Sequence, residues 1–324
     1  MPIISTKGAF SAQGYGFGGN TGGPVGTKGI FALGGTPGAS TTRNKYTFAT
    51  CTSTSAASTS AASYYGSAAG NSTRGIFALG YVCGVTSTTR NKYTYACCSS
   101  TASGVGAASA ASYRGSAAGN STRGIFTLGV VAGGASTIRN KYTYACCSST
   151  ASGVGAASCG SQFGSAAGNS TRGIFALGSV CGVASTIRNK YTYACCSSTA
   201  TGVGSASASS YGGSAAGNST RGIFALGVAS GAVSTIRNKY TYACCSSTAS
   251  GVGAASCGSQ FGSAAGNSTR GIFALGSVAG VGPSTIRNKY TYACCTSTAS
   301  GVGAASCASY YGSAASNGTC GVNV

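Results

Sequence analysis

Short apolar runs and alternating runs recur along the chain and predict β-strands. Residues 174–177 (Ile-Phe-Ala-Leu) form a four-residue apolar run between two glycines, which is typical of a strand buried on both faces. Residues 190–194 (Lys-Tyr-Thr-Tyr-Ala) alternate, so Tyr191 and Tyr193 share one face of a second strand. The pattern therefore predicts an all-β chain.

Two weaker segments complete the predicted unit. Residues 163–168 (Phe-Gly-Ser-Ala-Ala-Gly) are small, which suits a strand where backbones approach closely. Residues 168–171 (Gly-Asn-Ser-Thr) have the composition of a hairpin turn. The poorly hydrophobic Thr-Ala-Ser-Gly-Val-Gly-Ala-Ala-Ser stretch after Cys196 is typical of an exposed edge strand. Four antiparallel strands are expected in each unit.

This unit is repeated in series. The Thr-Lys/Arg-Gly motif starts at Thr27, Thr73, Thr122, Thr171, Thr220 and Thr269. The Arg-Asn-Lys-Tyr-Thr motif starts at Arg43, Arg90, Arg139, Arg188, Arg237 and Arg287. A fixed period of about 49 residues indicates one supersecondary unit copied along a single domain, residues 1–324, in which neighbours bury each other's apolar faces. Four antiparallel strands per repeat predict the blades of a β-propeller.

The count of innermost strands predicts seven blades. Small-residue segments occur at 15–19, 64–70, 113–119, 163–168, 211–217, 261–266 and 310–315. Residues 11–309 supply six full repeats. In this prediction, residues 1–10 give the outer strands of a closing blade and residues 310–324 give its inner strands. Pairing the start of the chain with its end would close the ring and remove exposed sheet edges. Six blades with loose ends is the alternative.

The repeats resemble the kelch-like repeats. Residues 30–35 (Ile-Phe-Ala-Leu-Gly-Gly) look like the second kelch strand with its double glycine, and Asn-Lys-Tyr-Thr-Tyr looks like the third strand. The chain departs from the family because most copies keep one glycine and the outer-strand tryptophan is missing. It is most similar to kelch-like repeat proteins of bacteriophages and bacteria. This resemblance implies a virion component, such as a phage structural protein of the tail or capsid, made in the host cytoplasm.

The charge composition excludes most catalytic chemistry. The chain has 20 Lys and Arg residues but no Asp, Glu or His, for a formal net charge of +20. Side-chain carboxylates and imidazoles are therefore not available as general bases, and carboxylate sites for calcium or magnesium cannot form. We expect no enzyme, no cofactor and no metal site. The excess positive charge favours polyanionic or acidic partners.

The basic residues of the repeats form two sets. One follows the turn between the first and second strands and comprises Lys28, Arg74, Arg123, Arg172, Arg221 and Arg270. The other follows the loop between the second and third strands and comprises Arg43, Lys45, Arg90, Lys92, Arg139, Lys141, Arg188, Lys190, Arg237, Lys239, Arg287 and Lys289. These turns lie at opposite ends of a blade, so we predict a basic ring on each face of the disc. The alternative is that the arginines cover tyrosine rings and cap loop carbonyls.

Cysteines and asparagines recur at fixed repeat positions. Most of the 17 cysteines read as small buried hydrophobes, including five adjacent pairs. Candidate disulfides join Cys147 to Cys159, Cys245 to Cys257 and Cys295 to Cys307. The Asn-Ser-Thr triplets fit the glycosylation acceptor pattern, but without a signal peptide we read them as turns.

The sequence thus predicts a non-enzymatic structural or adhesion propeller that binds acidic protein surfaces, polysaccharide or lipopolysaccharide. Many equivalent weak contacts would add up in such a protein. No apolar run approaches the length of a membrane helix, so no membrane insertion is expected. One alternative is a nucleic-acid-binding protein that uses its basic rings. Another is a cysteine-based redox or soft-metal protein, and the alternative locations are the cytoplasm and the cell surface.

Overall fold

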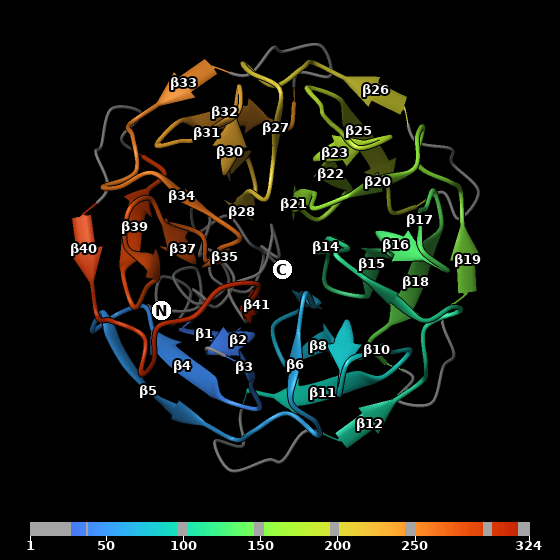
Figure 1. Ribbon diagram of the computed structural model, residues 1–324, viewed down its shortest axis with the longest axis horizontal. Coiled ribbons are helices and arrows are strands. Elements are labelled where there is room, and N and C mark those ends of the chain that lie inside the picture. Colours follow the sequence, from blue (N-terminus) through green and yellow to red (C-terminus); the bar gives the residue numbers. More distant parts are fainter. Residues whose placement is uncertain are drawn as a thin grey trace, which may run out of the picture.

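The computed structural model describes residues 27–36, 38–95, 103–145, 152–194, 201–243, 250–293 and 300–316. Within these ranges the chain is all-β, with β-strands and no helix. Accordingly, no helix in this part of the chain is long and apolar enough to span a membrane. The strands form repeated small antiparallel sheets, as the sequence predicts, and these sheets are arranged around a central axis (Figure 1).

Six four-stranded sheets, numbered here sheets 1 to 6, make up the ring of described residues. From the axis outward, sheet 1 contains β41 (Ser313–Ser316), β1 (Lys28–Ala32), β4 (Arg43–Thr47) and β5 (Thr52–Ala56). Sheet 2 contains β7 (Ser67–Gly70), β8 (Arg74–Ala78), β11 (Arg90–Thr94) and β12 (Ser103–Val105). Sheet 3 contains β14 (Ala117–Gly119), β15 (Arg123–Thr127), β18 (Arg139–Thr143) and β19 (Ser152–Val154).

The remaining three sheets repeat the same order. Sheet 4 contains β21 (Ser165–Gly168), β22 (Arg172–Ala176), β25 (Arg188–Thr192) and β26 (Thr201–Val203). Sheet 5 contains β28 (Ser214–Gly217), β29 (Arg221–Ala225), β32 (Arg237–Thr241) and β33 (Ser250–Val252). Sheet 6 contains β35 (Ser263–Gly266), β36 (Arg270–Ala274), β39 (Arg287–Thr291) and β40 (Ser300–Val302). The predicted strand order, with the small-residue strand innermost and the weak strand outermost, is confirmed.

The C-terminal segment shares a sheet with an N-terminal strand, as the sequence predicts, but the prediction of a separate seventh blade for residues 310–315 is wrong. Strand β41 pairs antiparallel with β1, and Ile30 lies opposite Ala315. The last described strand is therefore the inner strand of sheet 1. The innermost strands then contact one another in a closed cycle, β41, β7, β14, β21, β28 and β35. The other predicted parts of the seventh blade, residues 1–10, 15–19 and 317–324, lie outside the described residues.

The hydrophobic core lies between adjacent sheets. In one such layer, Ile125 of sheet 3 packs with Phe175 and Tyr191 of sheet 4. The same pattern recurs at each junction, and at the last one Ile272 of sheet 6 packs with Phe31 of sheet 1. The apolar run of the second strand is buried on both faces because successive side chains point to the two neighbouring sheets.

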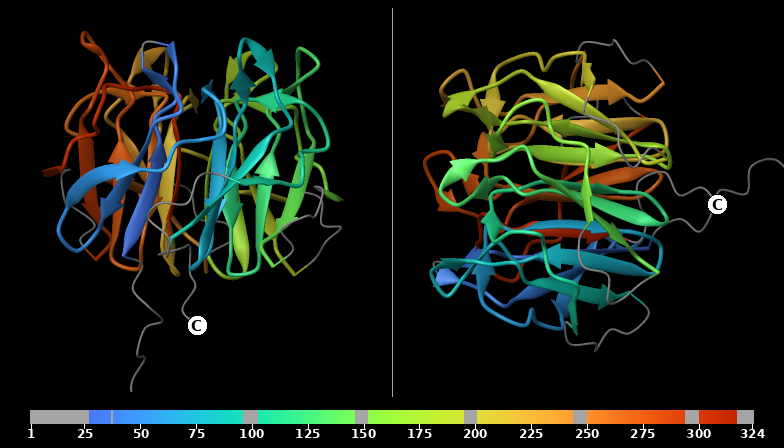
Figure 2. Two further views of the ribbon diagram at one scale, coloured as in Figure 1. Left: turned by 90° about the horizontal axis from the view of Figure 1, so that it is seen from below. Right: turned by 90° about the vertical axis from the view of Figure 1, so that its right-hand side faces the viewer.

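A second layer of structure was not predicted. The segment between the second and third strands of each sheet forms a short hairpin. In sheets 2 to 6 this hairpin pairs with the residues that lie just before the inner strand of the same sheet. We call these small sheets the cap sheets and the end of the ring that carries them the cap face. Figure 2 shows them gathered at one end of the molecule.

Five cap sheets have three strands and one has two. They are β6 (Ser63–Tyr64), β9 (Tyr81–Val82) and β10 (Val85–Thr86); β13 (Ser112–Tyr113), β16 (Val130–Val131) and β17 (Gly134–Ala135); β20 (Ser161–Gln162), β23 (Ser179–Val180) and β24 (Val183–Ala184); β27 (Ser210–Tyr211), β30 (Val228–Ala229) and β31 (Ala232–Val233); β34 (Ser259–Gln260), β37 (Ser277–Val278) and β38 (Gly282–Pro283); and the pair β2 (Gly35–Thr36) and β3 (Gly38–Ala39).

We predict that the folded chain resists acid. Acid denaturation arises mainly from carboxylates and histidines that bind protons more readily in the unfolded state. With no Asp, Glu or His, the side chains of both states carry the same protons from pH 7 down to pH 2. Urea unfolding at pH 7, 4 and 2 should give the same midpoint. A midpoint that falls steadily on acidification would contradict this.

Candidate functional site

The first basic set links neighbouring sheets on the face opposite the caps. Each of these residues is the first of the second strand in its sheet, and its side chain is half-buried. Arg172 Nη1 donates to the carbonyl of Tyr242 at 2.8 Å, and Lys28 Nζ donates to the carbonyl of Tyr95 at 3.2 Å. The same link to the next sheet is made by Arg74, Arg123, Arg221 and Arg270. This set therefore caps carbonyl groups, as the structural alternative proposed.

The turn that precedes each of these basic residues is held by its asparagine. Asn169 Oδ1 accepts from the backbone nitrogens of Thr171 and Arg172, and its Nδ2 donates to the carbonyl of Ser219 in the next repeat. The Asn169 side chain is buried. The turn reading of the described Asn-Ser-Thr triplets is thereby confirmed.

The arginines of the second set are buried and cannot form a surface ring. Arg43, Arg90, Arg139, Arg188, Arg237 and Arg287 are each 0–1% exposed. Strand register does place them at the end of the sheet opposite the first set, as predicted. However, the cap sheets lie over that end. The prediction of a basic ring there is wrong for these six guanidinium groups.

Each buried guanidinium lies against the next sheet. The Cζ of Arg287 lies 4.8 Å from the ring centroid of Phe31, and its Nη2 donates to Asn44 Oδ1 at 3.1 Å. Burial lowers the pKa of Arg287 to about 10, an effect that the nearby Tyr46 opposes. Burial likewise lowers the pKa values of the other five arginines to about 10. They stay protonated at neutral pH, so six positive charges are compensated by ring faces, amide oxygens and carbonyl groups.

The lysines of the second set lie two residues after these arginines on the third strand. Lys45, Lys92, Lys141, Lys190, Lys239 and Lys289 are half-buried. Their backbone positions lie in the middle of the third strand, opposite the isoleucine of the second strand, and not at either end of the sheet.

One cysteine of each candidate disulfide lies outside the described residues, so these pairings stay predictions. Cys159 and Cys257 are half-buried free thiols, and Cys307 is an exposed free thiol. Their candidate partners Cys147, Cys245 and Cys295 lie outside the described residues, as do the five adjacent cysteine pairs. Among described residues, no three potential metal-ligating side chains of His, Cys, Asp or Glu gather.

The feature that stands out is the centre of the cap face. One residue from each repeat, two or three positions before the inner strand, lies close to the axis with φ between 56° and 66°. We call these the axial residues: Tyr65, Arg114, Phe163, Gly212, Phe261 and Tyr311. Each backbone N–H donates to the carbonyl of the axial residue in a neighbouring repeat, at 2.7–3.1 Å. These six hydrogen bonds run around the axis without a break.

The axial side chains pack into one cluster. The ring centroids of Tyr65 and Tyr311 are 3.9 Å apart, and those of Phe261 and Tyr311 are 4.4 Å apart. Phe163 and Phe261 meet at 5.2 Å across the place where Gly212 has no side chain. Burial raises the pKa of the Tyr311 hydroxyl, and its hydrogen bond with Tyr65 adds to this effect.

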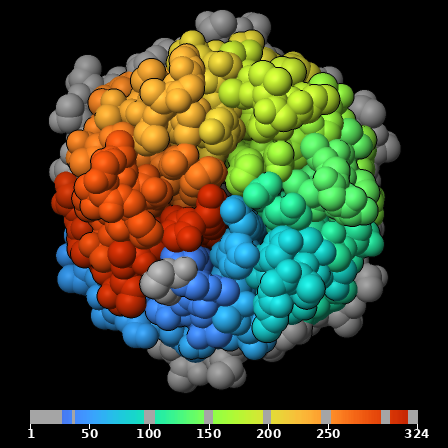
Figure 3. All heavy atoms as spheres, viewed as in Figure 1, coloured from blue at the N-terminus to red at the C-terminus, as the bar shows by residue number. Residues whose placement is uncertain are grey.

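The axial cluster surrounds a hollow, which we call the axial mouth. The six axial residues and the glycine that follows each of them line an open space of about 360 Å³, which includes the solvent above it. Below it, a second hollow is lined by alanines of all six inner strands and by glycines of four of them. Figure 3 views the molecule from the cap face, where the repeats meet around this point.

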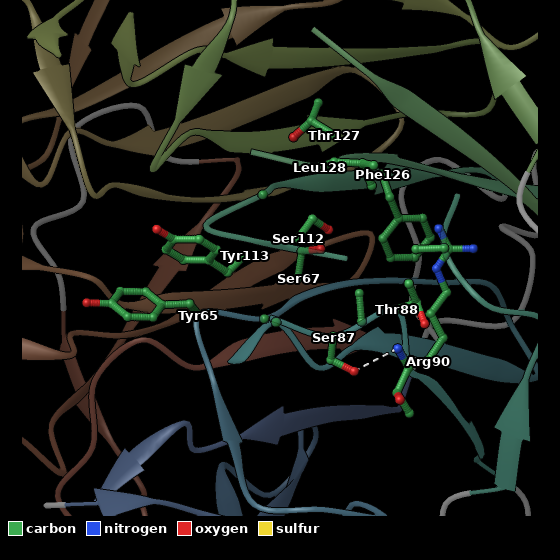
Figure 4. A pocket seen from close by; sticks show the side chains of 16 residues that line it. Tyr65, Ser67, Ser87, Thr88, Arg90, Ser112, Tyr113, Phe126, Thr127 and Leu128 are labelled. Carbon is green, nitrogen blue, oxygen red and sulfur yellow. Dashed lines mark hydrogen bonds between the residues drawn. The ribbon is translucent and has the colours of Figure 1, made fainter. Parts of the chain in front are cut away.

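Clefts between neighbouring sheets are the other hollows. A narrow cleft lies between sheets 2 and 3. In Figure 4 the rings of Tyr65 and Tyr113 lie at one end of it, and Arg90 lies beside Phe126 at the other. A similar cleft recurs between sheets 4 and 5. Because the repeats share these clefts, they do not single out one site.

Sequence reasoning missed the axial residues. The repeats agree at core positions, where Arg-Asn-Lys-Tyr-Thr is the same in all six copies, whereas the axial position carries Tyr, Arg, Phe and Gly. Comparison of the repeats with one another would have exposed this position. The sequence alone would not have shown that this position forms a site, because the six residues come together only when the sheets form a ring.

Neither a search against protein-family models nor a search of curated proteins finds a match to the chain. The resemblance to kelch-like repeats therefore stays an expectation from the sequence motifs.

We predict that the buried arginines stabilise the fold much more than the lysines beside them. Arg287→Ala removes charge-assisted hydrogen bonds and ring contacts from a buried site and should cost about 3 kcal/mol of unfolding free energy. The matched control Lys289→Ala, on the same strand, should cost under about 1 kcal/mol. Urea unfolding of both variants measures the difference. Equal losses of unfolding free energy in the two variants would contradict a larger stabilising role for the buried arginines.

We predict that replacing the axial residue Gly212 by alanine destabilises the fold less than replacing the nearby Gly227. A Cβ at Gly212 meets the Phe261 ring at 2.8 Å, and that ring can shift. A Cβ at Gly227 collides with the backbone oxygen of Tyr211, which cannot rotate away. We expect Gly212→Ala to cost about 1 kcal/mol and Gly227→Ala about 3 kcal/mol by urea unfolding. The reverse order would contradict this reading.

Proposed function

We propose that the chain is a six-bladed β-propeller that acts as a non-catalytic binding module, with the axial mouth as its ligand site. The closed cycle of inner strands and the pairing of β41 with β1 support six blades instead of seven. Each four-stranded sheet corresponds to one blade, and its short edges are protected within the ring.

One observation carries the choice of site. The fold constrains the axial position equally in all six repeats, yet this position has four residue types. Side chains that differ on an otherwise repetitive scaffold give the mouth an asymmetric chemistry. Asymmetry of this kind suits recognition of one ligand, because a few placed groups in a hollow determine specificity.

The same observations reduce the case for nucleic acid. The six buried arginines cannot reach phosphates, and the first basic set already donates to backbone carbonyls. Binding through two basic rings would need both sets on the surface. The virion or cell-surface location stays a prediction from the kelch-like resemblance, and a binding module of this kind is compatible with it.

A panel of immobilised neutral polysaccharides, acidic polysaccharides and duplex DNA tests the proposal. We expect the protein to retain at least one polysaccharide, and the Tyr65→Ala/Tyr311→Ala variant to bind it at least about tenfold more weakly. That variant removes the closest ring pair of the mouth. The control Val85→Ala/Val183→Ala removes exposed side chains from the cap hairpins and should bind like the wild type.

Two results would contradict the proposal. One is the absence of polysaccharide binding, and the other is equal loss in both variants. Binding to DNA that falls steeply with salt and ignores the axial variant would instead favour the nucleic-acid alternative.

A further inference from the structure

Arg114 is a basic residue that does not belong to the repeat pattern. The chain has 20 Lys and Arg residues, of which 18 occupy the two repeated sets. Lys7 lies outside the described residues. The remaining one, Arg114, is an axial residue at the place where other repeats have Tyr, Phe or Gly. Arg114 therefore does not take part in the repeated contacts that the two basic sets make between sheets.

Aromatic rings hold the Arg114 guanidinium in place. Its Cζ lies 4.3 Å from the ring centroid of Phe163, 4.8 Å from that of Tyr65 and 4.9 Å from that of Tyr113. Nη1 donates to Gln162 Oε1 at 3.1 Å. This contact fixes the plane of the group and leaves donor capacity on the rest of it.

The positive charge of Arg114 has no acidic side chain to pair with. No Asp or Glu exists anywhere in the sequence. Its Nε is buried and has no hydrogen-bond acceptor among the described residues. A guanidinium that is stacked on rings, oriented by one amide and half-buried at a mouth is prepared to meet an anion from outside.

We infer that the axial mouth binds the carboxylate of an acidic sugar residue, with one ligand per protein molecule; this rests on the proposed function above. The planar guanidinium matches a carboxylate in shape and charge. The half-buried rings of Tyr65 and Tyr311 line the mouth and offer apolar surface to the C–H-rich side of a sugar ring. The hollow is open to solvent, so a small ligand can reach it from outside.

The stoichiometry follows from the asymmetry of the mouth. Six basic residues in a ring would offer six equivalent contacts, whereas the axial mouth has one guanidinium. One anionic group can therefore be neutralised there at a time. This separates the inference from binding by many weak contacts spread around the disc.

Isothermal titration calorimetry with D-galacturonic acid, D-galactose and D-galactose 6-phosphate tests the inference. We expect galacturonic acid to bind one to one and at least about tenfold more tightly than galactose. The phosphate sugar should bind no more tightly than galacturonic acid. Arg114→Phe should weaken galacturonic acid binding at least about tenfold. Phe163 and Phe261 already occupy equivalent positions with φ of 56°, against 61° for Arg114, so the backbone accepts this residue.

Lys289→Ala is the matched control, because it also lowers the net charge by one but lies away from the mouth. It should bind galacturonic acid like the wild type. Circular dichroism melting of both variants checks that each is folded. Undetectable binding of galacturonic acid, equal affinity for galactose, tighter binding of the phosphate sugar, or unchanged binding in Arg114→Phe would each overturn the inference. If a neutral polysaccharide binds in a Tyr65-dependent and Arg114-independent way, the proposed function stands and the acidic-sugar inference fails.

Discussion

The structure depends on burying six guanidinium groups between sheets in a chain that has no acidic side chain. A buried charge ordinarily needs an ion pair or strong hydrogen bonds. Here each arginine of the third strand lies against an aromatic ring of the next sheet, as Arg139 lies against Tyr191. Each also donates to a backbone carbonyl, as Arg139 does, or to the asparagine of the next sheet, as Arg90 does. This constraint accounts for the identity of Arg-Asn-Lys-Tyr-Thr in every repeat: the arginine, the asparagine and the tyrosine belong to one contact between sheets.

The same contacts join the ends of the described chain. Arg287 of sheet 6 reaches Asn44 and Phe31 of sheet 1 as its equivalents reach their own neighbours. Strand β41 completes sheet 1 from the inside. The junction between sheets 6 and 1 is therefore held by the same kind of contacts as the junctions between other adjacent sheets.

The strands could be predicted because their patterns are local. The apolar run at 174–177 and the alternation at 190–194 specify which faces are buried, and the structure agrees. The cap sheets could not be predicted, because their two-residue strands are too short to show a period and their turn residues read as loop. The number of blades depended on where residues 310–315 pair, which is a long-range choice that composition does not reveal. The cap sheets cover the end of the ring where the arginines lie. Because the cap sheets were not predicted, these arginines were wrongly expected at the surface.

The ring of axial hydrogen bonds has an electrostatic consequence. Helix ends and backbone nests attract anions because their amide groups point outward together. At this mouth each of the six amides donates to the carbonyl of a neighbouring axial residue, so none of them is left to point at a ligand. These six amides therefore do not form an anion-binding nest. A scaffold built this way leaves the choice of ligand to the six axial side chains, so one substitution could change its selectivity without altering the frame.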